Sequence, residues 1–326
     1  MSTAPFPTHI QIQTTSACGA ACSICPHPVE SPKWSNGLMS DTLFDRIVDQ
    51  LRGQDIEYLC PYLMADPMSD RKIFERMVII RNALPATHIE VSTTGLYLAP
   101  RIAERLLAAP LSELRISSHG ITAEEWARTM PGVDYEKAWP NVLRFIEAWR
   151  QTKPYKLYIV TLWGLWTKQR EAEIEAFWRD LDVEIVRWQV ISRAGEVNLT
   201  VFGEGSQQRA LRSPDKKDPP YGCRFNRDTQ WVHILSDGRL TLCCMDYKHE
   251  AILGNVLDST LEEIWHSRAF ERVRARVRGD LPTDGQFICD RCEWHVSRAT
   301  MEPKSSEARR GVRCAATGVE PEQVGV

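Results

Sequence analysis

Three cysteines, Cys18, Cys22 and Cys25, lie within eight positions in the segment TTSACGAACSICPHP, residues 14–28. A structural zinc site is closed by four ligands that usually come in two pairs, so three thiols leave one position open. An iron–sulfur cube held by three cysteines keeps one iron free for a small-molecule ligand. The spacing C-x3-C-x2-C therefore favours a cluster that binds a small molecule, with a zinc knuckle or an incidental cysteine cluster as the alternative.

Four further cysteines, Cys223, Cys243, Cys289 and Cys292, form a second pattern in the last third of the chain. The segment QWVHILSDGRLTLCC (230–244) reads as a strand, an Asp-Gly turn and a strand, which would carry Cys243 back towards Cys223. Cys289 and Cys292 form a C-x2-C pair. Four thiols close a site, and zinc ribbons share this hairpin-plus-pair layout, so zinc stays open as an alternative.

The remaining cysteines have simpler interpretations. Cys60 ends an apolar strand and reads as a small buried hydrophobe, and Cys314 lies in a polar tail that we predict to be disordered. Cys244 follows Cys243, and alternation along a strand would point its side chain to the opposite face. By itself this pattern indicates a thiol packed beside a metal site.

Composition describes an ordinary soluble chain. The 326 residues are 43% hydrophobic with a formal charge of −3, which gives no global basic character for nucleic acid or membranes. The N-terminus lacks the features of a signal peptide, and no apolar run is long enough for a membrane span. We therefore expect a cytoplasmic protein, where cysteines are more often metal ligands than disulfides.

Short apolar, β-branched runs alternate with helical patterns along the first 200 residues. The predicted strands are 9–14, 55–60, 88–93, 113–118, 156–162 and 184–191, and the predicted helices are 40–51, 70–84, 99–109, 136–151 and 168–182. Alternation of this kind predicts βαβ units and an α/β fold, here a partial (β/α)6 TIM-like barrel. Chemistry in such barrels lies at the C-terminal ends of the strands, and the cysteine triplet follows the first strand.

This layout resembles the radical S-adenosylmethionine (SAM) superfamily. The resemblance covers about the first 200 residues and implies a [4Fe-4S] cluster on Cys18, Cys22 and Cys25 whose open iron chelates SAM. It further implies reductive cleavage of SAM to a 5′-deoxyadenosyl radical, which abstracts hydrogen from an unactivated C–H bond. The family often has an aromatic residue before the last cysteine, where this chain has Ile24.

The resemblance also implies which residues surround the cofactor. Asp66 before Pro67 lies where the family has a Gly-Gly-Glu-Pro-like segment that receives the SAM amino group. Arg193 lies in ISRAGEV, similar to an Arg-Ala-Gly segment of the family, near SAM or substrate. The third and fourth strands would bring further polar residues to the barrel mouth, where each could instead satisfy a local turn: Ser92, Thr94, Ser117 and His119.

The C-terminal cysteine pattern resembles the "twitch" auxiliary-cluster domain, the shortened form of the SPASM domain. That resemblance implies one auxiliary [4Fe-4S] cluster, because Arg298 occupies the place of the next SPASM cysteine. It also makes Cys244 a candidate hydrogen-atom donor, as in some related epimerases. The expected division is a barrel (1–200), a linker (201–218), an auxiliary domain (219–300) with one helix capped by Ser259 or Thr260, and a disordered tail (301–326).

The expected substrate is a small polar metabolite: a sugar, an aminocyclitol or a nucleoside that is dehydrogenated, decarboxylated or epimerised. The cysteine layout resembles that of 2-deoxy-scyllo-inosamine dehydrogenase, with cytosylglucuronate decarboxylase as a further small-molecule relative. The expected reducing partner is a flavodoxin or ferredoxin, and Trp163 and Trp166 are candidates for stacking on the substrate. A ribosomally made peptide is the rival substrate, and a zinc-stabilised nucleic-acid-binding protein with RVRARVR (272–278) as its basic face is the non-enzymatic alternative.

Overall fold

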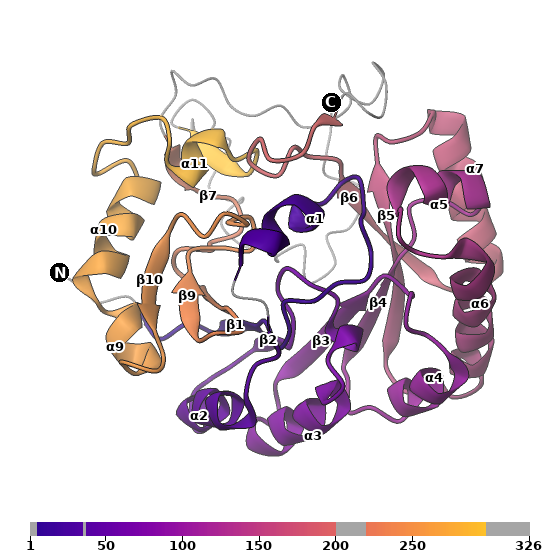
Figure 1. The fold of residues 1–326 in the computed structure, drawn as a ribbon, viewed down its shortest axis with the longest axis horizontal. Coiled ribbons are helices and arrows are strands. Elements are labelled where there is room, and N and C mark those ends of the chain that lie inside the picture. Colours follow the sequence, from indigo (N-terminus) through magenta and orange to yellow (C-terminus); the bar gives the residue numbers. More distant parts are fainter. Residues whose placement is uncertain (1–4, 35–36, 200–219, 298–326) are drawn as a thin grey trace, which may run out of the picture.

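The computed structural model describes residues 5–34, 37–199 and 220–297, and it is built on a curved nine-stranded sheet (Figure 1). The six predicted strands are all present and neighbouring strands pair in parallel, so the α/β partial barrel is confirmed. Their bounds are β1 (His9–Ile12), β2 (Tyr58–Cys60), β3 (His88–Thr93), β4 (Glu113–Ser117), β5 (Lys156–Trp163) and β6 (Glu184–Gln189).

Helices connect successive strands and lie around the outside of the curved sheet (Figure 1). In α2, the Ser40 hydroxyl accepts a hydrogen bond from the Leu43 amide, as the predicted cap requires. The helices predicted from sequence are α2 (Asp41–Leu51), α3 (Ile73–Ala83), α4 (Pro100–Leu107), α6 (Tyr135–Thr152) and α7 (Lys168–Asp180). Shorter elements add to them: α1 (His27–Glu30), η1 (Ser31–Lys33), η2 (Pro67–Ser69) and α5 (Ala123–Thr129).

The two faces of the barrel strands differ in chemistry. Aliphatic residues such as Ile10, Val91 and Ile116 are fully buried in the core that includes the outer helices. The residues next to them in sequence face the barrel interior and are polar: Gln11, Glu90, Ser92, Arg115 and Ser117 line a cavity. Parallel sheets covered on both faces are usually apolar throughout, so this polar inner face indicates that the barrel encloses a polar space.

The C-terminal strands extend the barrel sheet beyond its first strand. Strand β8 (Trp231–Ile234) pairs in parallel with β1, with His233 opposite Gln11, and continues into the antiparallel strands β9 (Arg239–Thr241) and β10 (Ile252–Asn255). The predicted Asp-Gly hairpin is confirmed, and Gly238 adopts a φ of 87° at its turn. The hairpin therefore continues the barrel sheet instead of forming a separate layer.

Beyond the hairpin, the predicted single helix is wrong, because the segment forms two helices. Thr260 caps α9 (Leu261–Trp265) in a capping box, and Ser267 caps a new helix, α10 (Arg268–Val277). A small sheet then pairs β7 (Pro220–Cys223) with β11 (His295–Ser297), beside the short helix α11 (Ile288–Arg291).

In the basic segment 272–278, Arg272 and Arg278 are exposed, but Arg274 is not. Arg274 is fully buried, stacks on Trp265 and Phe270, and donates hydrogen bonds to the carbonyl oxygens of Asp228 and Trp265. This arginine therefore packs within the C-terminal region and is not part of the basic face suggested for 272–278.

Some predictions fall on residues outside the described ranges: the linker 201–218, the tail 301–326, Arg298 and Cys314. Within the described ranges, none of the helices combines the length and the hydropathy needed to span a membrane.

Candidate active site

The first cysteine site is a loop that follows β1 at the C-terminal edge of the sheet. Burial raises the pKa of Cys18 to about 11, with smaller contributions from the charges of Asp66 and Cys25. Burial also raises the pKa of Cys22, and the charges of Cys25 and Cys18 raise it further. The three thiols therefore lie together beside Asp66, and a metal would have to displace their protons on binding.

Backbone contacts pin this loop to its neighbours. The Ala21 amide donates to the Pro131 carbonyl at 2.7 Å, and the Ser23 amide donates to the Thr129 carbonyl at 3.1 Å. On the other side, the Tyr97 hydroxyl accepts from the Gly19 amide at 3.1 Å. The thiols are thus carried on a backbone fixed by the loops that follow the third and fourth strands.

Asp66 is buried at the end of the loop after β2 and joins that loop to the end of β3. Its Oδ2 accepts hydrogen bonds from the Thr93 hydroxyl (3.0 Å), the Thr94 amide (2.9 Å) and the Thr94 hydroxyl (2.8 Å). Its Oδ1 accepts from the Met68 amide at 3.0 Å. Burial raises the pKa of Asp66, although these hydrogen bonds favour the charged form. Two predicted cofactor residues, Asp66 and Thr94, are therefore in direct contact.

Below this loop, the barrel encloses a cavity of about 1920 Å³. Ser92 and Ser117 line it, as predicted from their strands. Deeper in the barrel, the Glu90 carboxylate accepts hydrogen bonds from the Tyr58 hydroxyl (3.0 Å) and the Tyr62 hydroxyl (2.7 Å).

Cys60 belongs to the same buried network. Its thiol donates to Glu90 Oε2 at 3.4 Å, and Arg115 lies 3.8 Å from the same oxygen. Cys60 is buried, as predicted, but it faces this polar network and lines the cavity.

His119 lies in the loop after β4 and is buried outside the residues that line the cavity. Burial lowers the pKa of His119 to about 3, helped by the positive charge of Arg193. Its carbonyl oxygen accepts a hydrogen bond from the Trp166 indole at 2.6 Å. Trp166 therefore binds this loop, while Trp163, the other predicted stacking residue, lines the cavity.

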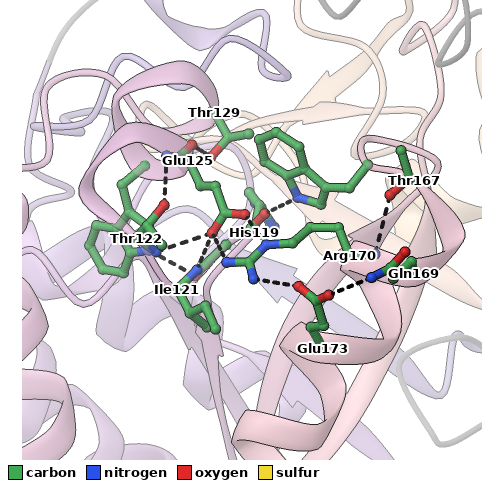
Figure 2. A network of polar contacts seen from close by, with 12 residues as sticks. His119, Ile121, Thr122, Glu125, Thr129, Thr167, Gln169, Arg170 and Glu173 are labelled. Atoms are coloured by element: carbon green, nitrogen blue, oxygen red, sulfur yellow. Dashed lines mark hydrogen bonds and ion pairs between the residues drawn. The ribbon is translucent and has the colours of Figure 1, made fainter.

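A polar network anchors the His119 loop to the helix after β5 (Figure 2). Glu125 Oε2 accepts hydrogen bonds from the backbone amides of Ile121 (2.7 Å) and Thr122 (3.1 Å). Arg170 donates to Oε1 of the same carboxylate at 2.6 Å and to Glu173 at 2.8 Å. The carboxylate of Glu125 thus joins the loop after β4 to helix α7.

Arg193 lies in the loop after β6 and lines the cavity. Its Nη1 donates to the Met245 sulfur at 3.5 Å. Burial lowers the pKa of Arg193, but the nearby Tyr247, Cys25 and Cys244 outweigh burial and raise it overall. The guanidinium therefore lies between the first cysteine site and Cys244.

The second cysteine site is gathered from three segments around the same cavity. Burial raises the pKa of Cys289, and the charges of Cys292, Cys243 and Cys223 add to this effect. All four of these residues line the cavity, so the predicted set is brought together.

The expected strand alternation at Cys244 is wrong. Strand β9 ends at Thr241, so Cys243 and Cys244 lie in the turn that follows it. Both residues line the cavity instead of facing opposite sides of a strand.

Sequence reasoning missed two residues of this region. The Tyr247 hydroxyl accepts a hydrogen bond from the Cys25 thiol at 3.6 Å, and Glu293 binds the backbone of the Arg193 loop. Both follow a cysteine of the second site within four positions, but nothing in the local sequence signals contacts to such distant segments.

The donors at both sites fit iron–sulfur clusters, because thiolates are the ligands of such clusters. In the described part of the chain, no three Cys, His, Asp or Glu side chains converge tightly enough to hold a single metal ion. A cube of four irons takes each thiolate on a different iron, and the two sites offer three and four thiols.

A family model described as the SPASM iron-sulfur cluster-binding domain matches residues 223–293. The chain is also similar to BtrN in complex with AdoMet and 2-DOIA, at 14% identity and a TM-score of 0.54, over 85% of this chain and 90% of that one. No curated protein matches the sequence.

Two further structures share the fold. SuiB from Streptococcus suis, bound to precursor peptide SuiA, has 13% identity and a TM-score of 0.63, over 88% of this chain and 71% of that one. Native anSMEcpe with bound AdoMet has 14% identity and a TM-score of 0.59, over 82% of each chain. The chain therefore shares its fold with these structures and has a C-terminal match to the SPASM domain, and both findings agree with the resemblance to the radical SAM superfamily.

Proposed function

We propose that this protein reductively cleaves SAM and abstracts hydrogen from a small polar metabolite, most simply a sugar, an aminocyclitol or a nucleoside. The observation that carries the proposal is a single cavity bounded by the polar inner face of the barrel, by Arg193 and by the second cysteine site. The three-thiol loop lies at the strand ends where barrel enzymes place their chemistry.

The chain's residues divide the work of holding the cofactors. Cys18, Cys22 and Cys25 would hold a [4Fe-4S] cluster, and the four thiols of the second site would hold one auxiliary cluster. With SAM bound, the first cluster would supply the electron that cleaves SAM to methionine and a 5′-deoxyadenosyl radical. A flavodoxin or ferredoxin is the proposed source of the electron.

Polar side chains near the first site would bind and orient SAM. Asp66, kept in place by Thr93 and Thr94, offers a carboxylate for the SAM amino group. Ser92 and Ser117 offer hydroxyls at the cavity wall for the ribose or the carboxylate. The buried position of His119 favours a role in shaping the loop over direct contact with substrate.

The proposed substrate class rests on the chemistry of the cavity wall. The cavity wall carries both hydrogen-bond donors and acceptors, from Glu90, Arg115 and Gln11. It also carries the aromatic rings of Trp163 and Trp188, on which a sugar or a base could stack. Small-ligand pockets usually measure about 300–1,000 Å³. The larger cavity here must also house the cofactors.

A peptide substrate is the second candidate. The cavity volume leaves room for an extended chain, and SuiB, with the same fold, is bound to a precursor peptide. Cys244 bears on the reaction type, since its thiol at the cavity wall could return a hydrogen atom to a substrate radical. One electron and one proton from the reducing system would then restore that thiol.

The test uses anaerobically reconstituted protein, dithionite and SAM, with 5′-deoxyadenosine as the readout. Deuterated sugars, aminocyclitols, nucleosides and peptides are then compared for deuterium transfer into 5′-deoxyadenosine. Transfer from one of the small metabolites supports the proposal, and transfer from peptides alone supports the rival. Protein with both clusters that forms no 5′-deoxyadenosine contradicts both. In Cys244→Ala we expect 5′-deoxyadenosine formation to persist, with loss of product only if the thiol donates hydrogen.

A further inference from the structure

The loop after β6 has an unusual backbone. Arg193 and Ala194 adopt φ values of 54° and 57°, followed by Gly195 at 86°. Side chains with a Cβ rarely adopt this left-handed region, and two in succession need outside contacts to hold them.

Those contacts come from the second cysteine site. The Glu293 carboxylate accepts hydrogen bonds from the Ser192 amide at 2.5 Å, from the Ser192 hydroxyl, and from the Ala194 amide at 3.2 Å. Arg291 donates from Nε to the Ala194 carbonyl at 3.2 Å. The segment 289–293 thus hydrogen-bonds to two backbone amides and one backbone carbonyl of the loop.

This backbone turns the Arg193 side chain into the cavity. Within the described residues, no carboxylate forms an ion pair with its guanidinium, which donates a hydrogen bond to the neutral Met245 sulfur at 3.5 Å. Met245 lies two residues before Tyr247, whose hydroxyl accepts a hydrogen bond from the Cys25 thiol at 3.6 Å, so the guanidinium lies near the first cysteine site. Against burial, which lowers it, the charges of Tyr247, Cys25, Cys244 and Glu293 raise the pKa of Arg193.

We propose that Glu293 is a positioning residue: it holds Ser192–Ala194 in the conformation that places the Arg193 guanidinium beside the first cysteine site. The inference rests on the proposed function and adds a second role for the auxiliary domain. Besides carrying its own thiols, that domain sets the positive charge near the SAM-binding site. A cation in a poorly hydrated site stabilises the more negative, reduced state of a neighbouring cluster and so raises its reduction potential.

The first test is a redox titration of reconstituted protein, followed by electron paramagnetic resonance. The signal that changes when SAM is added identifies the first cluster. We expect Arg193→Gln to lower the midpoint potential of that cluster. Glu293→Gln should lower it by less, because the lost negative charge of Glu293 partly offsets the displaced cation, and the double variant should lower it no further than Arg193→Gln alone. The control is Glu250→Gln, which removes the Glu250–Arg291 ion pair but leaves the Glu293 contacts to Ser192 and Ala194 in place.

Because Glu293 follows Cys292, its substitution could cost the auxiliary cluster. Ser192→Ala then tests the same contact without changing Glu293, because it removes the Ser192 hydroxyl that donates to the Glu293 carboxylate. We expect a smaller potential shift of the same sign in this variant, with the iron content unchanged. An unshifted potential in both Glu293→Gln and Ser192→Ala overturns the inference.

A second readout does not depend on catalysis. Trypsin cleavage after Arg193, followed by mass spectrometry, should be at least fivefold faster in Glu293→Gln than in the wild type or Glu250→Gln. Equal cleavage rates in Glu293→Gln and the wild type would contradict a role of Glu293 in holding the Arg193 loop. Wild-type protein that does not cleave SAM would overturn the proposed function, whereas normal SAM cleavage with an unmoved potential would overturn only the positioning role.

Discussion

The two cysteine sites differ in how the chain assembles them. The first set lies within eight positions of one loop, whereas the second draws on three segments spread over residues 223–292. Local backbone geometry can bring the first set together once the loop is anchored. The second set needs the hairpin, the β7–β11 pairing and α11 to form before its thiols meet.

They also differ in what surrounds them. Buried aspartate and hydroxyl groups lie beside the first site, as suits a site with an open position for a polar ligand. Four thiols line the second site, as suits a cluster saturated by protein. Under the proposed function, the open site carries the reaction and the closed site supports it.

The sharpest test of this difference is Cys22→Ala. We expect loss of about four irons per chain and a fall in 5′-deoxyadenosine formation of at least about 1,000-fold, or about 4 kcal/mol of barrier. Iron and sulfide analysis with a SAM cleavage assay measures both. Intact SAM cleavage in this variant would end the assignment of the first site.

The matching change at the second site is Cys292→Ala. We expect it also to lose about four irons, while SAM cleavage without substrate stays within about threefold of wild type, since the open site is retained. The same two assays apply. A loss of SAM cleavage as deep as that of Cys22→Ala would show that the two sites are not functionally distinct.

A substitution at Gly132 should affect the first cysteine site and leave the second intact, without changing a cysteine. It adopts a φ of 87°, and a Cβ there would lie 2.9 Å from the Ala21 amide nitrogen and 3.1 Å from the Gly19 carbonyl oxygen. Gly132→Ala should therefore displace the first cysteine loop, reduce its iron content and lower the free energy of unfolding by about 2 kcal/mol.

The control for this variant is Gly53→Ala. Gly53 has a similar φ of 77° but nothing within 4 Å of an added Cβ, so only the backbone cost of about 1 kcal/mol applies. Equal iron content at the first site in both variants would contradict the role of the loop contact. Thermal or denaturant unfolding supplies the stability difference.

The smallest expected effect concerns His119, beside the first site. The folded pKa of about 3 lies below the ordinary value, so the unfolded chain takes up a proton first as the pH falls. His119 therefore costs stability progressively from about pH 6.5 downwards, by up to about 1.4 kcal/mol per pH unit. His119→Gln should flatten the dependence of unfolding free energy on pH between about 6 and 5, and an unchanged slope would contradict a neutral buried imidazole.

Much of the fold was predictable because its signals are local. Six strands and five helices follow from apolar periodicity, and Ser40 and Thr260 cap helices as their positions suggest. The single helix after Thr260 was wrong because Ser267 starts a second helix within an otherwise continuous apolar pattern. Cys244 was misplaced because the strand before it ends at Thr241, three residues before Cys244.

The sequence by itself determined the chemistry that is available: three thiols in one loop, four further thiols in the last third of the chain, and a parallel α/β scaffold. The tertiary structure alone decided that β8 pairs with β1, which places the second set of thiols on the same cavity as Ser92 and Arg193. It also brought the Glu293 carboxylate into hydrogen bonds with the backbone of the Arg193 loop, which lies about a hundred residues earlier in the sequence. Periodicity reports which face of an element is apolar, but contacts between distant segments depend on how the packed elements meet.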